Sequence, residues 1–347
     1  MNKRTTIVDI ATRLGITPSA VSKAFSDHPR ISRETKSQVQ KVAQELGYHR
    51  NLLATGLRKG KSGLIGVVVP GVHYSFFSTA IKGIEEYVTA GGYNVVIVQS
   101  RDSAALEKTQ LEGLLRAQVE GIIASVAGGT REYSEYVAVS RHLPVVLFDR
   151  TFSHENISEV TIDDFRGARL AVNHLVDMNY RRIAHLAGFA HVRAFGRRIE
   201  AYRQTLASHG IPVREDYIRQ CAPNSTEGER AMEALLQLEV APDAVFAASD
   251  YLAYGAMKTL LKRGYRIPED VGIVGFSNEE FTSQVTPDIS TVEQYSETMG
   301  SVAAQVLIDQ LQTVAKGLPC LSRQKVIEPR LIVRHSSRRE SARINTQ

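Results

Sequence analysis

The sequence predicts a small all-α helix-turn-helix head followed by an α/β body of two doubly wound parallel-sheet lobes. Apolar residues recur at helical spacing through the first 47 residues, and from Leu64 onward apolar runs alternate with amphipathic stretches. Continuous apolar strands that alternate with helices are typical of parallel sheets covered on both faces. The body has too many such units for one compact sheet. We therefore expect two lobes, with a binding cleft at the carboxyl ends of their strands.

Three helices are expected in the head. The first has apolar residues at positions i, i+3, i+4 and i+7, namely Ile7, Ile10, Ala11 and Leu14. Gly15 ends this helix, and Thr17 is a good N-cap for the second. The third helix starts near Ser32 and closes at Gly47. Two short helices joined by a tight turn that contains glycine make a helix-turn-helix.

Charge is unevenly distributed along the chain. Residues 1–61 hold 12 Lys and Arg against 4 Asp and Glu, a net charge of +8, and the remainder holds 30 against 33, a net charge of −3. A basic head on a mildly acidic body is a footprint of nucleic-acid binding. The alternative is a solvated basic tail, which the helical periodicity of the head disfavours.

Several classes of protein are disfavoured by the sequence. It has no apolar run of the ~18 residues that span a bilayer and no signal-peptide core, so we expect a cytoplasmic protein without a membrane partner. Cys221 and Cys320 lack metal-ligand spacing. We find no nucleophile elbow and no phosphate-binding glycine loop, so neither an enzyme nor a cofactor is expected. A transport-binding protein would need a signal peptide and would lack the head.

Longer motifs carry a resemblance to a known family. The head reads "TIVDIATRLGITPSAVSKAFSDHPRISRETKSQVQKVAQELGYHRN" and continues into "NLLATGL". The body contains, in order, "VEGIIAS", "PVVLFDR", "HLVDMNYRRIAHLAG", "DAVFAASD" and "GYRIPEDVGIVGF". In order and spacing these stretches resemble the LacI/GalR (lactose-repressor) family of bacterial transcriptional regulators, over nearly the whole chain. The resemblance implies a periplasmic-binding-protein-like body whose lobes are joined by three crossovers.

The resemblance also implies a function and a domain organisation. We expect a sequence-specific DNA-binding regulator, in the simplest case a repressor, controlled by a small sugar or sugar derivative bound between the lobes. Its partners would be near-palindromic operator DNA on the nucleoid and a second copy in a homodimer. The expected domains are residues 1–50 (head), 51–62 (hinge helix and linker) and 63–340 (effector binding and dimerisation). The N-lobe would hold about 63–162 and 295–320, and the C-lobe about 163–294 and 321–340.

The expected DNA contacts fall into three groups. Pro18, Ser19 and Lys23 match the family's base-reading positions, with Ser22 on the same polar face, and Lys23 can donate to guanine O6 and N7. Contacts to the DNA backbone are expected from hydroxyls and one arginine: Thr6, Thr17, Ser26, Arg30, Ser32, Thr35 and Tyr48. Ser32 is equally suited to cap the third helix. The hinge contributes Asn51, Ala54 and Leu57, with Leu57 as a wedge in the minor groove.

The effector contacts implied by the resemblance are His73, Tyr74, Phe77, Ser125, Asp149, Arg198, Ser249, Asp250, Ser277 and Gln294. Phe77 matches the family's aromatic wall, and Arg198 matches its pocket arginine, whose fork can grip two oxygens. Two alternatives stay open, because Asp250 can serve as a helix cap and Asp149 can pair with a neighbour. Phe76 is expected in the core.

One departure from the family pattern bears on the charge of the effector. Many members carry an acidic pair where this sequence has Ser277 and Asn278. The presumed cleft is also surrounded by cationic residues: His73, Arg150, Arg193, Arg197 and Arg198. An anionic effector, such as a sugar acid or sugar phosphate, is therefore an alternative to a neutral sugar.

Overall fold

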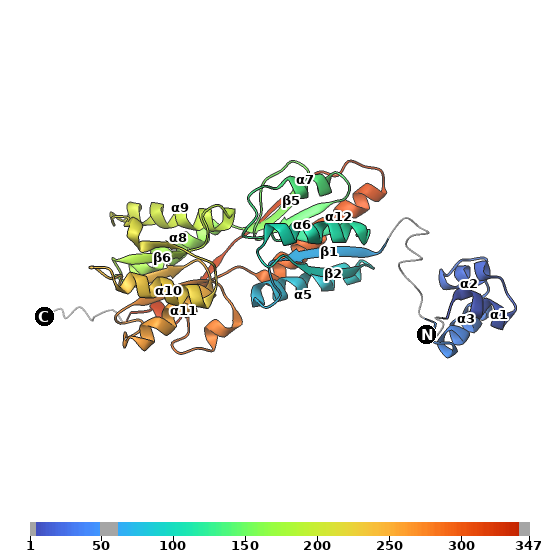
Figure 1. Ribbon diagram of the computed structural model, residues 1–347, viewed down its shortest axis with the longest axis horizontal. Helices are drawn as coiled ribbons and strands as arrows, with labels where there is room; N and C mark the ends of the chain where they lie inside the picture. The colour runs from blue at the N-terminus through green and yellow to red at the C-terminus, as the bar shows by residue number, and fades with distance from the viewer. Residues whose placement is uncertain (1–4, 49–61, 340–347) are drawn as a thin grey trace. The chain divides into compact units, whose positions relative to one another are not determined.

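The computed structural model describes residues 5–48 and 62–339, which fall into two units that we describe separately. The head contains α1 (Ile7–Leu14), α2 (Pro18–Phe25) and α3 (Arg33–Glu45) (Figure 1). Gly15 ends α1 with a φ of 66°, a conformation that glycine adopts without strain. Capping hydroxyls begin the next two helices: Thr17 accepts from the Ala20 amide and Ser32 from the Thr35 amide. The head core is made of Ile10, Ala11, Val21, Ala24, Val39 and Ala43.

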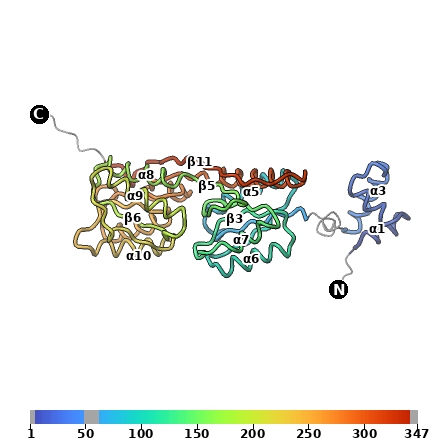
Figure 2. Tube along the Cα trace, turned by 90° about the horizontal axis from the view of Figure 1, so that it is seen from above, coloured from blue at the N-terminus to red at the C-terminus, as the bar shows by residue number. Residues whose placement is uncertain are grey.

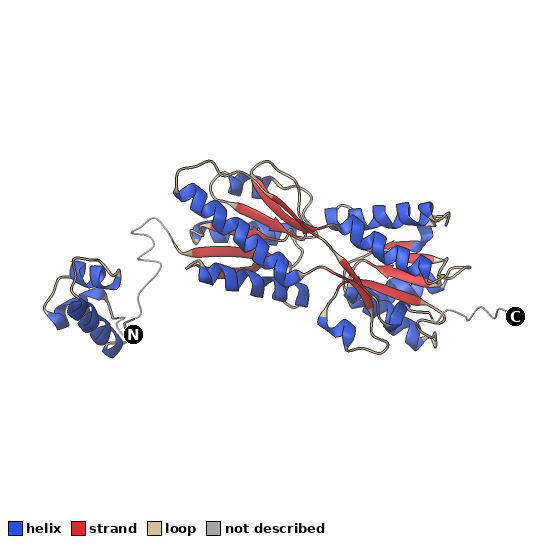
Figure 3. Ribbon diagram, turned by 180° about the vertical axis from the view of Figure 1, so that it is seen from behind, coloured by secondary structure: helices blue, strands red, loops and turns tan. Residues whose placement is uncertain are grey.

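The N-lobe of the body is built on a parallel sheet with the strand order β11-β5-β4-β3-β1-β2. Its strands are β1 (Leu64–Val69), β2 (Asn94–Gln99), β3 (Gly121–Ala124), β4 (Val145–Phe148), β5 (Ile157–Ile162) and β11 (Gln324–Ile327). Its helices are α5 (Ser75–Ala90), α6 (Ala104–Arg116), α7 (Ser134–Ser140) and α12 (Ser296–Ala315). Figure 3 shows helices on both faces of the sheet, which explains why its inner strands are continuous apolar runs.

The C-lobe is the second lobe of the body in Figure 2. It repeats this architecture, with the strand order β12-β10-β9-β8-β6-β7. Its strands are β6 (Ile183–Ala187), β7 (Ile218–Gln220), β8 (Ala244–Ala247), β9 (Gly272–Ser277), β10 (Ser290–Glu293) and β12 (Arg330–Ile332). Its helices are α8 (Asp164–Asp177), α9 (Arg193–Ser208), α10 (Ser225–Leu236) and α11 (Asp250–Lys262), with 3-10 turns at Glu215–Tyr217, Glu280–Ser283 and His335–Ser337. Only β12 among the described strands runs antiparallel, against β10.

The chain passes between the lobes after β5, after β10 and after β11, as three crossovers require. The last passage lies later than we predicted, because β11 pairs with β5 and so keeps residues 321–327 in the N-lobe. Three of the four residues of this edge strand are exposed, so it lacks the apolar run by which the other strands were recognised. Within the described residues, no helix is both long and apolar enough to cross a membrane.

Helices α5 and α12, far apart in sequence, pack side by side in the N-lobe. Two glycines allow this approach. A Cβ added at Gly300 would overlap the carbonyl oxygen of Ala80, and one added at Gly83 would overlap that of Glu297. Backbone cannot yield as a flexible side chain can, so these two positions require glycine.

This packing makes a testable prediction about Gly300→Ala. The added methyl group must separate α5 from α12, so the variant should lose about 1–3 kcal/mol of unfolding free energy in urea titrations. Gly113→Ala in α6 is the matched control, because its Cβ would meet nothing closer than 3.9 Å. That change should instead stabilise the protein by about 0.4–1 kcal/mol. Equal effects of the two substitutions would contradict the tight contact.

Candidate functional site

Helix α2 of the head presents a polar surface. Val21 and Ala24 are buried, whereas Pro18, Ser19 and Lys23 are exposed. Ser22 is partly buried on the same helix. The helix is thus anchored by its apolar side and offers short polar groups and one lysine on the other. This surface fits the major groove, which admits an α-helix and is read through hydrogen bonds to base edges.

Several residues predicted to contact the DNA backbone hold the head together. The Thr6 amide and hydroxyl both donate to Asp9 Oδ2 at 2.7 Å, which caps α1. Ser32 caps α3, which was the alternative to a DNA contact for this residue. Its hydroxyl lies 2.9 Å from that of Thr35. The hydroxyl of Ser26 donates to the Lys23 carbonyl. Their DNA contacts remain predictions.

The remaining head residues have different surroundings. Thr17 caps α2, and Arg30 is exposed. Tyr48 is partly buried, with its ring 5.5 Å from that of Phe25. Asn51, Ala54 and Leu57 lie outside the described residues.

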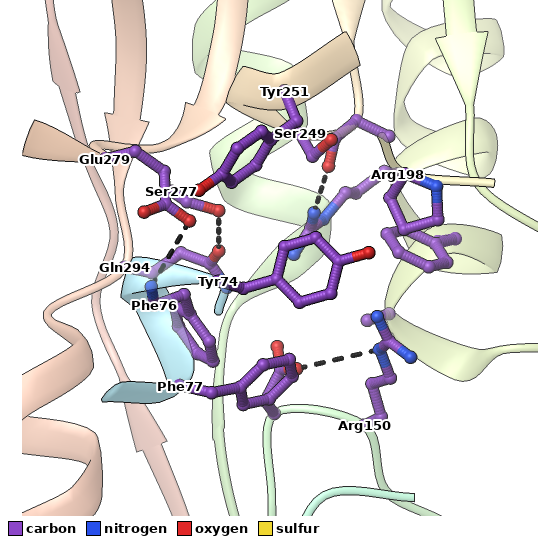
Figure 4. Close-up of a pocket in the computed structure, with 15 residues that line it drawn as sticks. Tyr74, Phe76, Phe77, Arg150, Arg198, Ser249, Tyr251, Ser277, Glu279 and Gln294 are labelled. Carbon is purple, nitrogen blue, oxygen red and sulfur yellow. Dashed lines mark hydrogen bonds and ion pairs between the residues drawn. The ribbon is translucent and has the colours of Figure 1, made fainter. Parts of the chain in front are cut away.

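The body encloses a cavity of about 50 Å³ between its lobes (Figure 4). Its walls come from the carboxyl ends of strands and from the helices that follow them, where open α/β sheets bind ligands. Seven of the predicted effector residues line it: Tyr74, Phe77, Asp149, Arg198, Ser249, Ser277 and Gln294. The other lining residues were not predicted effector contacts: Phe76, Arg150, Ala194, Phe195, Pro223, Ala248, Tyr251 and Glu279. Phe76 is buried as expected, but it also borders the cavity.

His73, Ser125 and Asp250 are not among the lining residues. His73 is exposed, with its ring 4.0 Å from that of Tyr74. Ser125 is fully buried and donates to Asp149 at 3.4 Å, so it supports a lining residue.

Asp250 is also fully buried, and it accepts from the Glu279 amide at 2.8 Å and from the Thr291 hydroxyl at 2.6 Å. It therefore braces the loop after β9. The cap of α11 is Ser249 and not Asp250, so the capping alternative for Asp250 is wrong.

All three guanidinium nitrogens of Arg198 interact with other groups of the protein. Its Nε and Nη2 lie 2.8 and 2.7 Å from Asp164 Oδ1, and its Nη1 donates to the Ala248 carbonyl at 2.6 Å. The guanidinium carbon also lies 3.6 Å from the centre of the Phe276 ring. Burial raises the pKa of Asp164, whereas the charge of Arg198 opposes that rise. Arg198 thus enters the cavity wall as part of a buried ion pair.

The arginines that we expected around the cleft are paired within the protein, and of these Arg150 and Arg198 line the cavity. Each of the other three arginines pairs with a carboxylate: Arg150 with Asp102, Arg193 with Glu159 and Arg197 with Glu200. A paired guanidinium attracts an anion far less than a free one. The paired arginines therefore give little support to an anionic effector, which stays an untested alternative.

Aromatic rings dominate the cavity. Tyr74 and Phe77 project into the space between Tyr251 and Arg150 (Figure 4). The rings of Tyr74 and Tyr251 meet edge to face at 5.5 Å, with one ring from each lobe. Such surfaces accept the apolar face of a flat or cyclic ligand. Hydroxyl and amide groups at the edge, such as Ser277, which donates to Gln294 at 2.7 Å, add polar contacts.

Glu279 is the least expected member of the site. Its side chain is buried, its Oε1 accepts from the Phe76 amide of the N-lobe at 3.3 Å, and its Oε2 has no partner within the described residues. Burial, reinforced by the charge of Asp250, raises the pKa of Glu279 from 4.5 to about 7. The only signal in the sequence was its place just after the run "VGIVGF", at the carboxyl end of a strand.

Glu279 makes the stability of the body depend on pH. Because its pKa is higher in the folded protein than in the unfolded chain, the folded state binds the extra proton, and the unfolding free energy falls as pH rises from about 4.5 to about 7. Glu279→Gln should flatten this dependence by on the order of 2 kcal/mol in urea titrations between pH 5 and 8.

The exposed neighbour Glu280 provides the control for that measurement. Glu280→Gln should keep the dependence of the wild type, including the contribution of Asp250, whose pKa burial raises to about 6. An unchanged pH profile in Glu279→Gln would show that this carboxyl group does not titrate in the range.

Comparisons with known proteins follow the same division into head and body. The model of "Bacterial regulatory proteins, lacI family" matches residues 6–51, and that of a "Periplasmic binding protein-like domain" matches residues 172–337. The chain is 30% identical over 334 residues to the HTH-type transcriptional repressor CytR of Escherichia coli (strain K12), with 96% of each chain covered.

Two solved structures share the fold of the chain. The lac repressor dimer bound to operator and an anti-inducer aligns with a TM-score of 0.82 at 24% identity, covering 96% of this chain and 99% of that one. The complex of the transcriptional regulator CelR with cellobiose aligns with a TM-score of 0.72 at 26% identity, covering 96% and 100%.

Proposed function

Since the chain belongs to the LacI family of bacterial regulatory proteins and is a DNA-binding transcriptional regulator, we propose that it represses transcription as a homodimer on near-palindromic operators and responds to a sugar-like effector. One observation carries the effector half of this proposal. The aromatic cavity is lined by both lobes, so a ligand there touches both of them at once.

The DNA half of the proposal rests on the exposed face of α2. Pro18, Ser19 and Lys23 would read base edges, while the hydroxyls near the helix ends and Arg30 would position the head on phosphates. Asn51, Ala54 and Leu57 would form the hinge contact in the minor groove. In this scheme residues 1–50 bind DNA, residues 51–62 connect, and residues 63–340 sense the ligand and dimerise.

The effector is proposed to be a carbohydrate or a related cyclic compound. A ring fits between Tyr74, Phe77 and Tyr251, and the CelR relative has been solved with cellobiose. Pockets for small molecules usually hold roughly 300–1,000 Å³, so the cavity of about 50 Å³ must enlarge to admit a ring. Ligand binding is therefore tied to a change in the lobes, and effector and DNA affect each other reciprocally.

The proposed setting is the bacterial cytoplasm, on the nucleoid, where operator DNA lies. We propose no catalytic activity and no cofactor for this regulator. Conversion of a sugar by the purified protein would contradict this part of the proposal.

Base reading by α2 can be tested by selecting bound sequences from a random DNA pool. Lys23→Ala should relax the preference at one position of each half-site, at a loss of about 1–3 kcal/mol. Arg30→Ala should weaken binding by a similar factor on every sequence and leave the motif unchanged. An identical selected motif for wild type and Lys23→Ala would show that α2 does not read bases.

The cavity can be tested with Tyr74→Ala, because this change leaves the buried pair of Arg198 and Asp164 intact. A panel of mono- and disaccharides would be screened for release of the selected operator. The releasing sugar should act on Tyr74→Ala only at concentrations raised ~10-fold or more, since one aromatic wall is gone. The control is Tyr87→Ala, which removes an exposed ring from the same helix and should respond as the wild type does. Equal responses of the two variants would place the effector elsewhere.

A further inference from the structure

A second cavity, of about 320 Å³, adjoins the aromatic one. Phe76, Ser277 and Glu279 border both cavities and form the wall between them. The second cavity lies where the chain crosses from β10 to α12, and its walls come from the starts of α5 and α12 and from the loop after β9. Like the first, it is therefore lined by both lobes.

The chemistry of the second cavity is acidic. Four glutamates border it: Glu279, Glu280, Glu293 and Glu297. Among the described residues that line it there is no lysine, arginine or histidine. The remaining lining consists mainly of hydroxyl groups and Phe76. A ligand with a positive charge would fit this lining, whereas an anion would be repelled.

Some of these four glutamates already interact with other groups of the protein. Glu293 accepts from the Tyr295 amide and from the Asn278 side chain, both at 2.6 Å. Glu297 pairs with the exposed side chain of Lys82 at 3.1 Å. Carboxylates also offset the positive ends of the two helices that begin here, Glu279 at α5 and Glu297 at α12.

Glu279 differs from the other three glutamates because its Oε2 is buried without a hydrogen-bond partner in the described part of the chain. Its side chain is only 6% exposed, and within the described residues this oxygen has no hydrogen-bond donor. A buried acceptor without a donor is rare and unfavourable, more so when it is ionised. This oxygen is sealed from solvent in the structure, so a donor from a ligand reaches it only when the wall between the two cavities shifts. A charged donor would then satisfy it best.

A metal ion is a poor candidate for that donor. Within the described residues, no three or more His, Cys, Asp or Glu side chains are grouped closely enough to hold one. The carboxylates are spread around a cavity that is large enough for several heavy atoms. An ammonium group, which donates three hydrogen bonds in different directions, matches such a lining better.

We propose that this acidic cavity is an amine subsite of the effector site. It takes the protonated amino group of a ligand whose ring lies among Tyr74, Phe77 and Tyr251, and Glu279 is its principal partner. The assignment of the ring rests on the proposed function, whereas the binding of an organic cation by the acidic cavity can be measured without it.

Putrescine, a small diamine, is the probe for the cation. The full-length protein would be titrated by calorimetry at pH 8 and constant ionic strength, with 1,4-butanediol as the neutral analogue of equal length. We expect saturable binding of putrescine and no binding of the diol. Glu279→Gln should weaken putrescine at least 10-fold, and Glu280→Gln should weaken it by a smaller factor.

Two further variants separate the amine subsite from its neighbours. Glu85→Gln removes an exposed glutamate of α5 that does not border either cavity, and it should bind putrescine as the wild type does. Tyr74→Ala should also keep putrescine binding, because Tyr74 borders only the aromatic cavity. If Glu279→Gln does not fold, the comparison of Glu280→Gln with Glu85→Gln replaces it.

The proposal is overturned if putrescine binds no better than 1,4-butanediol, if Mg²⁺ at equal ionic strength displaces it, or if the cavity variants bind as Glu85→Gln does. A failure of the proposed function looks different, because then no selected operator is released by any cyclic compound while putrescine binding persists. If a sugar releases the operator equally well from the wild type and from Glu279→Gln, the amine subsite is contradicted and the proposed function is not.

Discussion

The buried carboxylate of Asp250 holds the loop on which both cavities depend. It accepts hydrogen bonds from the Glu279 amide and from the Thr291 hydroxyl, and these bonds connect the end of β9 to α11 and β10. Gly275 makes this approach possible, because a Cβ there would overlap Asp250 Oδ1. Ser277 and Asn278 adopt positive φ angles of 128° and 54°, which non-glycine residues rarely do. Strain of this kind persists only where the surroundings fix it, and here it directs Ser277 and Glu279 toward the ligand site.

Around that loop the charges are arranged so that cations are paired and one carboxylate is not. The buried guanidinium of Arg198 is held by Asp164, and that of Arg150 is held by Asp102. Both guanidinium groups lie over the ring of Phe195 in the cavity wall, and that of Arg198 also lies over the ring of Phe276 behind it. Since a buried ion pair contributes little net attraction to a third charge, the unpaired oxygen of Glu279 becomes the strongest polar feature in the wall between the two cavities.

The sequence predicted what depends on neighbours along the chain. Helix caps such as Thr17 and Ser32, and strand ends such as Ser249 and Ser277, follow from local pattern and from the rule that α/β sheets bind ligands at the carboxyl ends of strands. The partner of Arg198 could not be predicted in this way, because Asp164 lies 34 positions away on another helix. The unpaired oxygen of Glu279 could not be predicted from the sequence either, because the side chain becomes buried only where both lobes meet around it. Strand β11 escaped notice because an exposed edge strand carries almost no apolar signal.

The hydrogen bond from the Phe76 amide to Glu279 Oε1 joins the two lobes directly. Its strength depends on the charge of the carboxyl group, because a bond to a carboxylate is stronger than one to a neutral acid. With a pKa of about 7, Glu279 is divided between the two forms near neutral pH. An ammonium group at Oε2 would keep it ionised and thereby strengthen the bond between the lobes. A ligand of this kind would bind the joined arrangement better than a separated one, and a difference in affinity between two states is what shifts their populations. The carboxyl group that recognises the ligand would then also report its presence to the rest of the body.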